Sequence, residues 1–256
     1  MESQTTALME TDHHQPLTRH SRITDRLVDL LQAKILREEL RPGDRLVEQK
    51  VARDFGVGQN PVREALIELA HKGFVCRFPR KGTYVTNLTR AQANKIERVK
   101  YVLEDLAMKL ILARPNAEAA DFSRAEVALD QMREATRQGN MVKFYENDMQ
   151  FHRIIWALAD NEYLAKALEQ LVAPLFATYT MRNIHPQARV RTFLEGVADH
   201  EAILAALNSR SAKKLREAHR RLRRGATRFQ NATLSGGRRE VEEPPIHARR
   251  RAGGTE

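Results

Sequence analysis

The sequence predicts a mainly α-helical protein, in which an N-terminal winged helix-turn-helix is followed by an all-helical antiparallel bundle. Three observations lead to this prediction. Apolar residues return every three or four positions over most of the chain, which is the spacing of amphipathic helices. The segment 74–86 instead alternates in the manner of a β-hairpin. The formal net charge is +10, and such an excess favours anionic partners such as nucleic acid.

Composition divides the 256 residues into four parts. We expect a flexible polar arm over residues 1–20 and a winged helix-turn-helix domain over residues 21–88. An all-α domain is expected over residues 89–231. Residues 232–256, in which Gly, Pro and Arg are clustered, are expected to form a disordered basic tail.

Cysteine usage and hydropathy indicate a cytoplasmic protein without membrane contact. Cys76 is the single cysteine, so the chain can form neither an intramolecular disulfide nor a cysteine-based zinc site. The opening "MESQTTALMETDHHQPL" has no basic segment followed by an apolar one, as a secretion signal would have. No apolar run approaches the length of a membrane span.

The first two expected helices lie before residue 57. Residues 21–40 carry apolar side chains on one helical face, and Pro42-Gly43 then breaks the helix. A short helix follows over residues 47–55, and Gly56 is expected to end it in the left-handed conformation. The apolar face of the first helix consists of Ile23, Leu27, Leu31 and Ile35.

The third helix and the hairpin complete the expected DNA-binding unit. Asn60 is a suitable N-cap and Pro61 a suitable first helical residue for a helix that runs to about His71. The segment "FVCRFPRKGTYVT" then reads as two strands joined by a turn with a basic tip, Arg80-Lys81. Three short helices followed by such a hairpin form a winged helix-turn-helix.

The second half of the chain reads as helix throughout, which predicts a compact antiparallel bundle. We expect Pro115 to end the first helix of this bundle, and Pro174 to separate two further helices. The expected helices after Pro115 cover residues 122–139, 141–159, 162–174, 175–184, 190–208 and 211–228.

Several polar side chains of the winged unit have the chemistry of DNA recognition. Arg63 lies near the start of the third helix, where its guanidinium can meet a phosphate or the edge of a guanine. An amide side chain can pair with adenine, and basic side chains around it can contact the backbone. An alternative is that Arg63 pairs with an acidic neighbour on its own surface. The expected DNA-binding residues are Arg53, Gln59, Asn60, Arg63, Arg80 and Lys81.

Histidines in the helical half suggest a metal site. Asp148 and His152 are spaced i, i+4, so they share one helical face and can chelate one ion. His200 and His219 occur among apolar residues and are expected to face the core. Three imidazoles and one carboxylate are a suitable ligand set for Zn²⁺, Ni²⁺ or Mn²⁺. The alternative is that these histidines are ordinary hydrogen-bonded core residues.

The segment "LREELRPGDRLVEQKVARDFGVGQNPVREALIELAHKGFVCRFPRKGTYV" resembles the N-terminal domain of the GntR transcription regulators. The resemblance covers about residues 20–90 and rests on "PG-x-x-L", "GV…PVREAL" and "G-T-x-V". Family members commonly carry Ser-Arg-Thr between "GV" and "PVREAL", where this chain has Gly58-Gln59-Asn60. The resemblance therefore implies the DNA-binding role of Arg63 but not the usual operator of the family.

Residues 95–225 resemble the FCD effector domain of FadR-like GntR proteins. The pattern "D-x-x-F-H…N-x-x-L" matches Asp148 and His152, and the further family histidines match His200 and His219. The stretch between the last two is about one helical turn shorter than is usual. The resemblance implies a divalent metal bound by Asp and three His, with a small carboxylate effector completing its coordination. Lys100 and Arg182 are the cations we expect beside such an effector.

Together these expectations describe a ligand-responsive regulator of transcription, a repressor rather than an enzyme. It would bind double-stranded operator DNA as a homodimer and respond to a small carboxylate metabolite. Two alternatives stay open on the sequence. One is a metal-dependent enzyme that uses Asp148, His152, His200 and His219, and the other is a non-specific DNA-binding protein.

Overall fold

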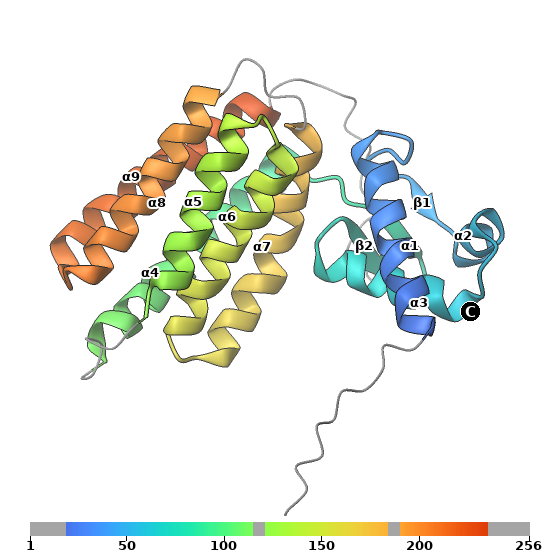
Figure 1. The fold of residues 1–256 in the computed structure, drawn as a ribbon, viewed down its shortest axis with the longest axis horizontal. Coiled ribbons are helices and arrows are strands. Elements are labelled where there is room, and N and C mark those ends of the chain that lie inside the picture. The colour runs from blue at the N-terminus through green and yellow to red at the C-terminus, as the bar shows by residue number, and fades with distance from the viewer. Residues whose placement is uncertain (1–18, 115–120, 184–189, 235–256) are drawn as a thin grey trace, which may run out of the picture.

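The computed structural model describes residues 19–114, 121–183 and 190–234. Within them the chain is mainly α-helical with one small sheet, which confirms the predicted fold class (Figure 1). We call residues 19–85 the head and residues 90–234 the bundle. In the described ranges, no helix combines the length and the apolar character that a membrane crossing requires.

Three helices form most of the head, namely α1 (Arg19–Leu36), α2 (Glu48–Phe55) and α3 (Gln59–His71). Gly56 ends α2 with φ 63° and ψ 34°, the left-handed conformation that the sequence predicts. The prediction that Asn60 caps α3 is wrong, because extended Gly58 precedes the helix and α3 already begins at Gln59. Pro61 is tolerated there because a first-turn N–H has no intrahelical partner.

The wing is a three-stranded antiparallel sheet in the order β1-β3-β2. The strands are β1 (Arg45–Leu46), β2 (Val75–Phe78) and β3 (Gly82–Val85). Phe78 pairs with Gly82 beside the tight turn, and Leu46 of β1 pairs with Thr83. The sequence predicts β2 and β3 but not β1, because two residues are too few to display alternation.

Six helices form the part of the bundle that the structure describes. The expected helix break at Pro174 is wrong, since one helix runs through this residue. A proline inside a helix costs about 3 kcal/mol, and here buried neighbours on both sides of Pro174 hold the helix in place. The bounds are α4 (Arg90–Ala113), α5 (Ser123–Arg137), α6 (Met141–Leu158), α7 (Glu162–Arg182), α8 (Val190–Asn208) and α9 (Ala212–Leu234).

The ends of the chain differ slightly from the expected division. Helix α1 begins at Arg19, inside the expected arm, and α9 extends to Leu234, inside the expected tail. The rest of the arm, residues 1–18, and the rest of the tail, residues 235–256, lie outside the described residues, as does Pro115.

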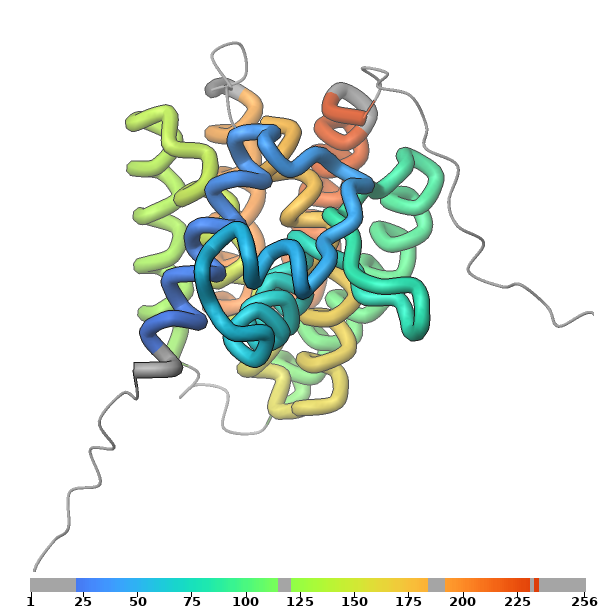
Figure 2. The backbone as a smooth tube through the Cα atoms, turned by 90° about the vertical axis from the view of Figure 1, so that its right-hand side faces the viewer, coloured from blue at the N-terminus to red at the C-terminus, as the bar shows by residue number. Residues whose placement is uncertain are grey.

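The head packs against α7 of the bundle (Figures 1 and 2). Ala177 and Met181 of α7 belong to the same buried apolar cluster as the core residues of α1 and α3. Gly73, after α3, approaches the α7 backbone so closely that a Cβ there would lie 2.2 Å from the carbonyl carbon of Ala173 and 2.5 Å from the nitrogen of Pro174. Helix α7 therefore serves the cores of both units.

Candidate metal centre and nucleic-acid interface

Three of the four expected metal ligands meet inside the bundle. Asp148 and His152 lie one turn apart on α6, and His200 lies opposite them on α8. The Nε2 atom of His200 lies 3.1 Å from Oδ1 of Asp148 and 3.2 Å from Nε2 of His152. The distance from Nε2 of His152 to the same Asp148 oxygen is 3.6 Å. We call these three residues the Asp–His–His group.

The spacing of these donor atoms suits one divalent ion. Ligand atoms about 2.1 Å from a metal lie roughly 3.0 Å apart in an octahedral site and roughly 3.4 Å apart in a tetrahedral one. The three observed distances, 3.1, 3.2 and 3.6 Å, fall around these values. Two imidazole nitrogens and one carboxylate oxygen are also donors that Zn²⁺, Ni²⁺ and Mn²⁺ accept.

A buried carboxylate that the sequence analysis missed contacts the Nδ1 side of the His152 ring. Oε1 of Glu104 on α4 lies 2.8 Å from Nδ1 of His152. Nζ of Lys100 donates to Oε2 of Glu104 over 2.9 Å, so the buried carboxylate is itself compensated. A carboxylate on Nδ1 fixes the tautomer that leaves Nε2 without a proton and turned toward Asp148 and His200. The i, i+4 spacing of Lys100 and Glu104 was the available sequence signal.

His219 is buried but lies outside the Asp–His–His group. Its Nε2 is 3.8 Å from Oε2 of Glu104, and its ring stacks on Tyr101 at 4.3 Å between centroids. Leu222, one turn further along α9, lines the cavity beside the group instead. The imidazole of His219 thus lies on the Glu104 side of His152 rather than beside Asp148 and His200.

The charges around the group favour the metal-binding forms of Asp148 and His152, and the protonated form of His200. Burial lowers the pKa of His152, which keeps this imidazole neutral. Burial opposes ionisation of Asp148, but the nearby His200 and His152 outweigh it and lower the pKa of this carboxyl. Burial likewise opposes protonation of His200, yet the Asp148 carboxylate raises its pKa overall. A metal ion would therefore have to displace a proton from His200 when it binds.

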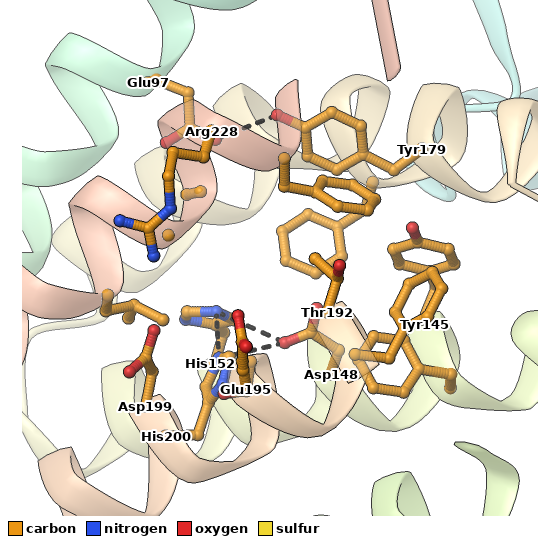
Figure 3. Close-up of a pocket in the computed structure, with 18 of the residues that line it drawn as sticks. Glu97, Tyr145, Asp148, His152, Tyr179, Thr192, Glu195, Asp199, His200 and Arg228 are labelled. Carbon is orange, nitrogen blue, oxygen red and sulfur yellow. Dashed lines mark hydrogen bonds and ion pairs between the residues drawn. The ribbon is translucent and has the colours of Figure 1, made fainter. Parts of the chain in front are cut away.

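A cavity of about 380 Å³ opens beside the Asp–His–His group (Figure 3). Lys100 lines it, as expected of an effector-binding cation, although its ammonium pairs with Glu104. Arg182 does not line it, and instead donates to the carbonyl of Leu88 over 3.5 Å. The cavity has a different arginine, Arg228 of α9, which the sequence analysis missed.

Other lining residues were also not expected from the sequence. Glu97, Glu195 and Asp199 bring carboxyl groups to the cavity wall. Burial raises the pKa of Glu97, which accepts a hydrogen bond from the hydroxyl of Tyr179 over 3.2 Å. These residues come from α4, α7 and α8, so only the packing of the helices brings them together. No local pattern distinguishes them from surface charges.

In the head, the expected DNA-binding residues are exposed. Gln59 and Asn60 form the start of α3, and Arg80 lies at the turn of the wing with φ 62°. Arg63 pairs with Glu48 of α2, whose Oε2 lies 3.1 Å from its Nη2. The surface pairing considered for Arg63 is therefore present in this structure, and 53% of its side chain is still exposed.

Comparison with known proteins identifies both units. Residues 23–85 match the family described as bacterial regulatory proteins, gntR family, and residues 96–224 match the FCD domain. The HTH-type transcriptional repressor RspR of Escherichia coli is 27% identical over 68% of this chain and 76% of its own. The regulator YdhC of Bacillus subtilis is 27% identical over 55% of this chain, and the match spans 62% of that relative.

The fold is shared with solved regulators. The structure of E. coli McbR/YncC superposes with a TM-score of 0.61, covering 82% of this chain and 97% of that one at 23% identity. The two matched families together span the head and most of the bundle, and their members regulate transcription rather than catalyse reactions. The chain therefore belongs to the GntR family of bacterial DNA-binding transcription regulators, and its helical part is an FCD domain.

Proposed function

We propose that this protein is a repressor whose bundle binds a divalent metal ion and a small carboxylate effector, and whose operator binding changes when the effector binds. The observation that carries the proposal is the convergence of Asp148, His152 and His200 on the wall of a 380 Å³ cavity. The similarity to RspR, which is named a repressor, supports the direction of control. The protein would act in the cytoplasm, where the chromosome lies.

The Asp–His–His group would hold the metal from three positions. Its remaining coordination positions would face the cavity, because Leu222 rather than an imidazole lines that wall. The ion would supply a Lewis acid for an effector carboxylate. Glu104 would keep His152 oriented, and Arg228 would supply the cationic partner that the sequence analysis assigned to Arg182. His219 would contribute through Glu104 and not as a ligand.

For DNA binding we propose the six residues of the head that the sequence analysis named, all of which are exposed. Gln59, Asn60 and Arg63 would meet base edges or phosphates at the N-terminal end of α3, and the others would contact the backbone. Arg63 would give up its ion pair with Glu48 in order to contact DNA. The free-energy cost is small, because exposed ion pairs contribute about 0–1 kcal/mol. The backbone contacts would come from Arg53, Arg80 and Lys81.

A homodimer would present two heads to a two-fold operator. An exposed apolar stripe on α4 supports this assembly. Val99, Val102 and Leu106 recur at i, i+3 and i+7, and their exposed fractions are 48%, 64% and 44%. Three large apolar side chains on one exposed helical face are typical of a surface that is covered by a partner.

The effector signal would reach the head through a shared wall. Tyr145 and Phe176 line the effector cavity and also a second cavity of about 230 Å³ between head and bundle. Phe74 and Lys72 of the head line that second cavity. A ligand that moves either ring would therefore change the docking of the head on α7, shifting the population of arrangements that fit the operator.

The test measures metal content and DNA binding together. Protein purified without chelator or histidine tag is analysed by mass spectrometry for metals, beside the double variant Asp148→Ala/His152→Ala. We expect about one equivalent of a transition metal per chain, lost in the variant, with unchanged affinity for a DNA site selected by the wild-type protein. The exposed-residue variant His71→Ala is the control and keeps its metal.

Two outcomes would contradict the proposal. Absence of metal from the wild type, even after incubation with Zn²⁺, Ni²⁺ or Mn²⁺, would make the Asp–His–His group an ordinary polar cluster of the core. Loss of folding in the double variant, seen as loss of the helical circular dichroism signal, would give the metal a structural instead of a sensory role.

A further inference from the structure

The end of the effector cavity beyond the Asp–His–His group is built from aromatic rings. They come from four helices and form one connected set. Ring centroids lie 4.9 Å apart for Phe144 and Phe193, 5.6 Å for Phe193 and Phe229, and 5.4 Å for Tyr179 and Phe229. Tyr145 joins the set at 5.3 Å from Phe144. We call these five residues the ring cluster, and all five line the cavity.

The ring cluster has little hydrogen-bonding capacity. Its polar side-chain atoms are the hydroxyl oxygens of Tyr145 and Tyr179, and the latter already donates to Glu97. A ligand hydroxyl against the rings of Phe144, Phe193 or Phe229 would lose its water without an equivalent partner. Each such hydroxyl would cost about tenfold in affinity. An apolar group in the same place would gain affinity by leaving water.

The opposite end of the cavity is polar and strongly charged. It holds the Asp–His–His group and the guanidinium of Arg228, while Tyr145 and Tyr179 lie on the other side of the space in Figure 3. The carboxyl groups of Glu97, Glu195 and Asp199 also line the cavity. Asp199 is already neutralised by Arg221, and Glu97 accepts from Tyr179. One ligand carboxylate at the metal and Arg228 would occupy this end, and a second carboxylate would lie against the ring cluster, where it would lose its hydration without a partner.

We propose that the effector is a monocarboxylate with an apolar body the size of an aromatic ring. Its carboxylate would lie at the metal and Arg228, and its body would pack against the ring cluster. This inference rests on the proposed metal and carboxylate function and adds the chemical class of the molecule. Polyhydroxy acids and dicarboxylates are both disfavoured by the ring cluster, because it offers few partners to a second polar group. The cavity volume of 380 Å³ accommodates such a molecule.

The test compares three carboxylates by isothermal titration calorimetry on the metal-loaded protein. The probes are 3-phenylpropanoate, gluconate and glutarate, which differ in their apolar, polyhydroxy and dicarboxylate character. We expect 3-phenylpropanoate to bind at least about tenfold more tightly than either of the others. Phe193→Ala should weaken that binding by about tenfold or more. Tyr163→Ala, which removes a ring with 79% exposure outside the cavity, should leave it unchanged.

A second variant distinguishes the loss of a ligand contact from misfolding. Phe193→Leu keeps an apolar side chain in the core but removes the ring, and it should retain the helical signal, the metal content and most DNA binding. Equal or tighter binding of gluconate or glutarate would overturn the proposed class. So would a Phe193→Leu variant that is folded and binds 3-phenylpropanoate as the wild type does.

Two results separate this inference from the function on which it rests. One equivalent of bound metal with no binding of 3-phenylpropanoate would reject the ligand class and leave the metal site standing. Absence of metal, together with binding of 3-phenylpropanoate that Asp148→Ala does not weaken, would reject the metal-centred function and the proposed placement of the carboxylate.

Discussion

Trp156 is a natural reporter of the Asp–His–His group. It is the single tryptophan of the chain, and its ring centroid lies 5.6 Å from that of His152. We predict that Ni²⁺ or Co²⁺ quenches its fluorescence on binding, because an open-shell ion at this distance deactivates the excited indole. A fluorescence titration would give the metal affinity directly.

Variants of two histidines then distinguish a ligand from its neighbour. His200→Ala should weaken the metal affinity by at least about tenfold, since it removes a donor atom of the Asp–His–His group. His219→Ala should have a smaller effect, because this imidazole contacts Glu104 instead. An equal loss in both variants would mean that His219 moves into the site as a fourth ligand.

The pair of Arg63 and Glu48 allows a similar comparison in the head. Arg63→Ala should weaken binding to a selected operator by about 1–3 kcal/mol, the range of one good contact to a base. Glu48→Ala breaks the same ion pair but leaves the guanidinium available, so it should maintain or strengthen binding. Fluorescence anisotropy at fixed salt measures both. Equal weakening in the two variants would show that the pair acts by stabilising the head.

At the scale of elements, the close approach of the head to α7 requires the absence of a side chain at Gly73. Gly73→Ala should destabilise the protein by about 1–3 kcal/mol through the clash with Ala173, in addition to the strain of an alanine at φ 79°. Thermal unfolding gives the value.

Gly139 provides the matched control for this substitution. Its φ is 68°, so Gly139→Ala introduces comparable backbone strain, but nothing lies within 4 Å of the added Cβ. The difference between the two variants isolates the contact between head and α7. If both variants lost the same stability, the head would not depend on this approach.

The exposed stripe of α4 predicts the oligomeric state. Val102→Asp should convert the proposed dimer to a monomer, because an aspartate at the centre of an apolar interface loses its hydration without a partner. Size-exclusion chromatography with light scattering measures the mass. Val127→Asp places the same charge on α5, where Val127 is 54% exposed, and should leave the dimer intact. If the wild-type protein were a monomer at micromolar concentration, the proposed interface on α4 would be wrong.

At the scale of the whole molecule, helical periodicity and the alternation over residues 74–86 were sufficient to predict a winged head followed by a bundle. The spacing of apolar residues reports which face of a helix is buried, and this information is local. It also placed Asp148 and His152 on one face and turned His200 and His219 inward. His219 points inward but contacts Glu104 instead of the Asp–His–His group. The inward direction of a side chain therefore does not specify which neighbour it contacts.

The remaining features depend on packing between distant segments. Strand β1 exists because β3 pairs with it, and α7 continues through Pro174 because two cores hold it. The members of the ring cluster come from α6, α7, α8 and α9. In the sequence, each of these residues is an ordinary apolar position of its own helix. Such features arise from tertiary contacts that override local preference.

The use of α7 by both cores has a consequence for engineering. New repressors are readily imagined by joining the head of one protein to the sensor of another at the connection between Val85 and Arg90. In this protein such a cut would leave Ala177 and Met181 facing a foreign surface, and would lose the fit of Gly73 on Ala173. A working chimera would have to transplant the matching face of α7 together with the head.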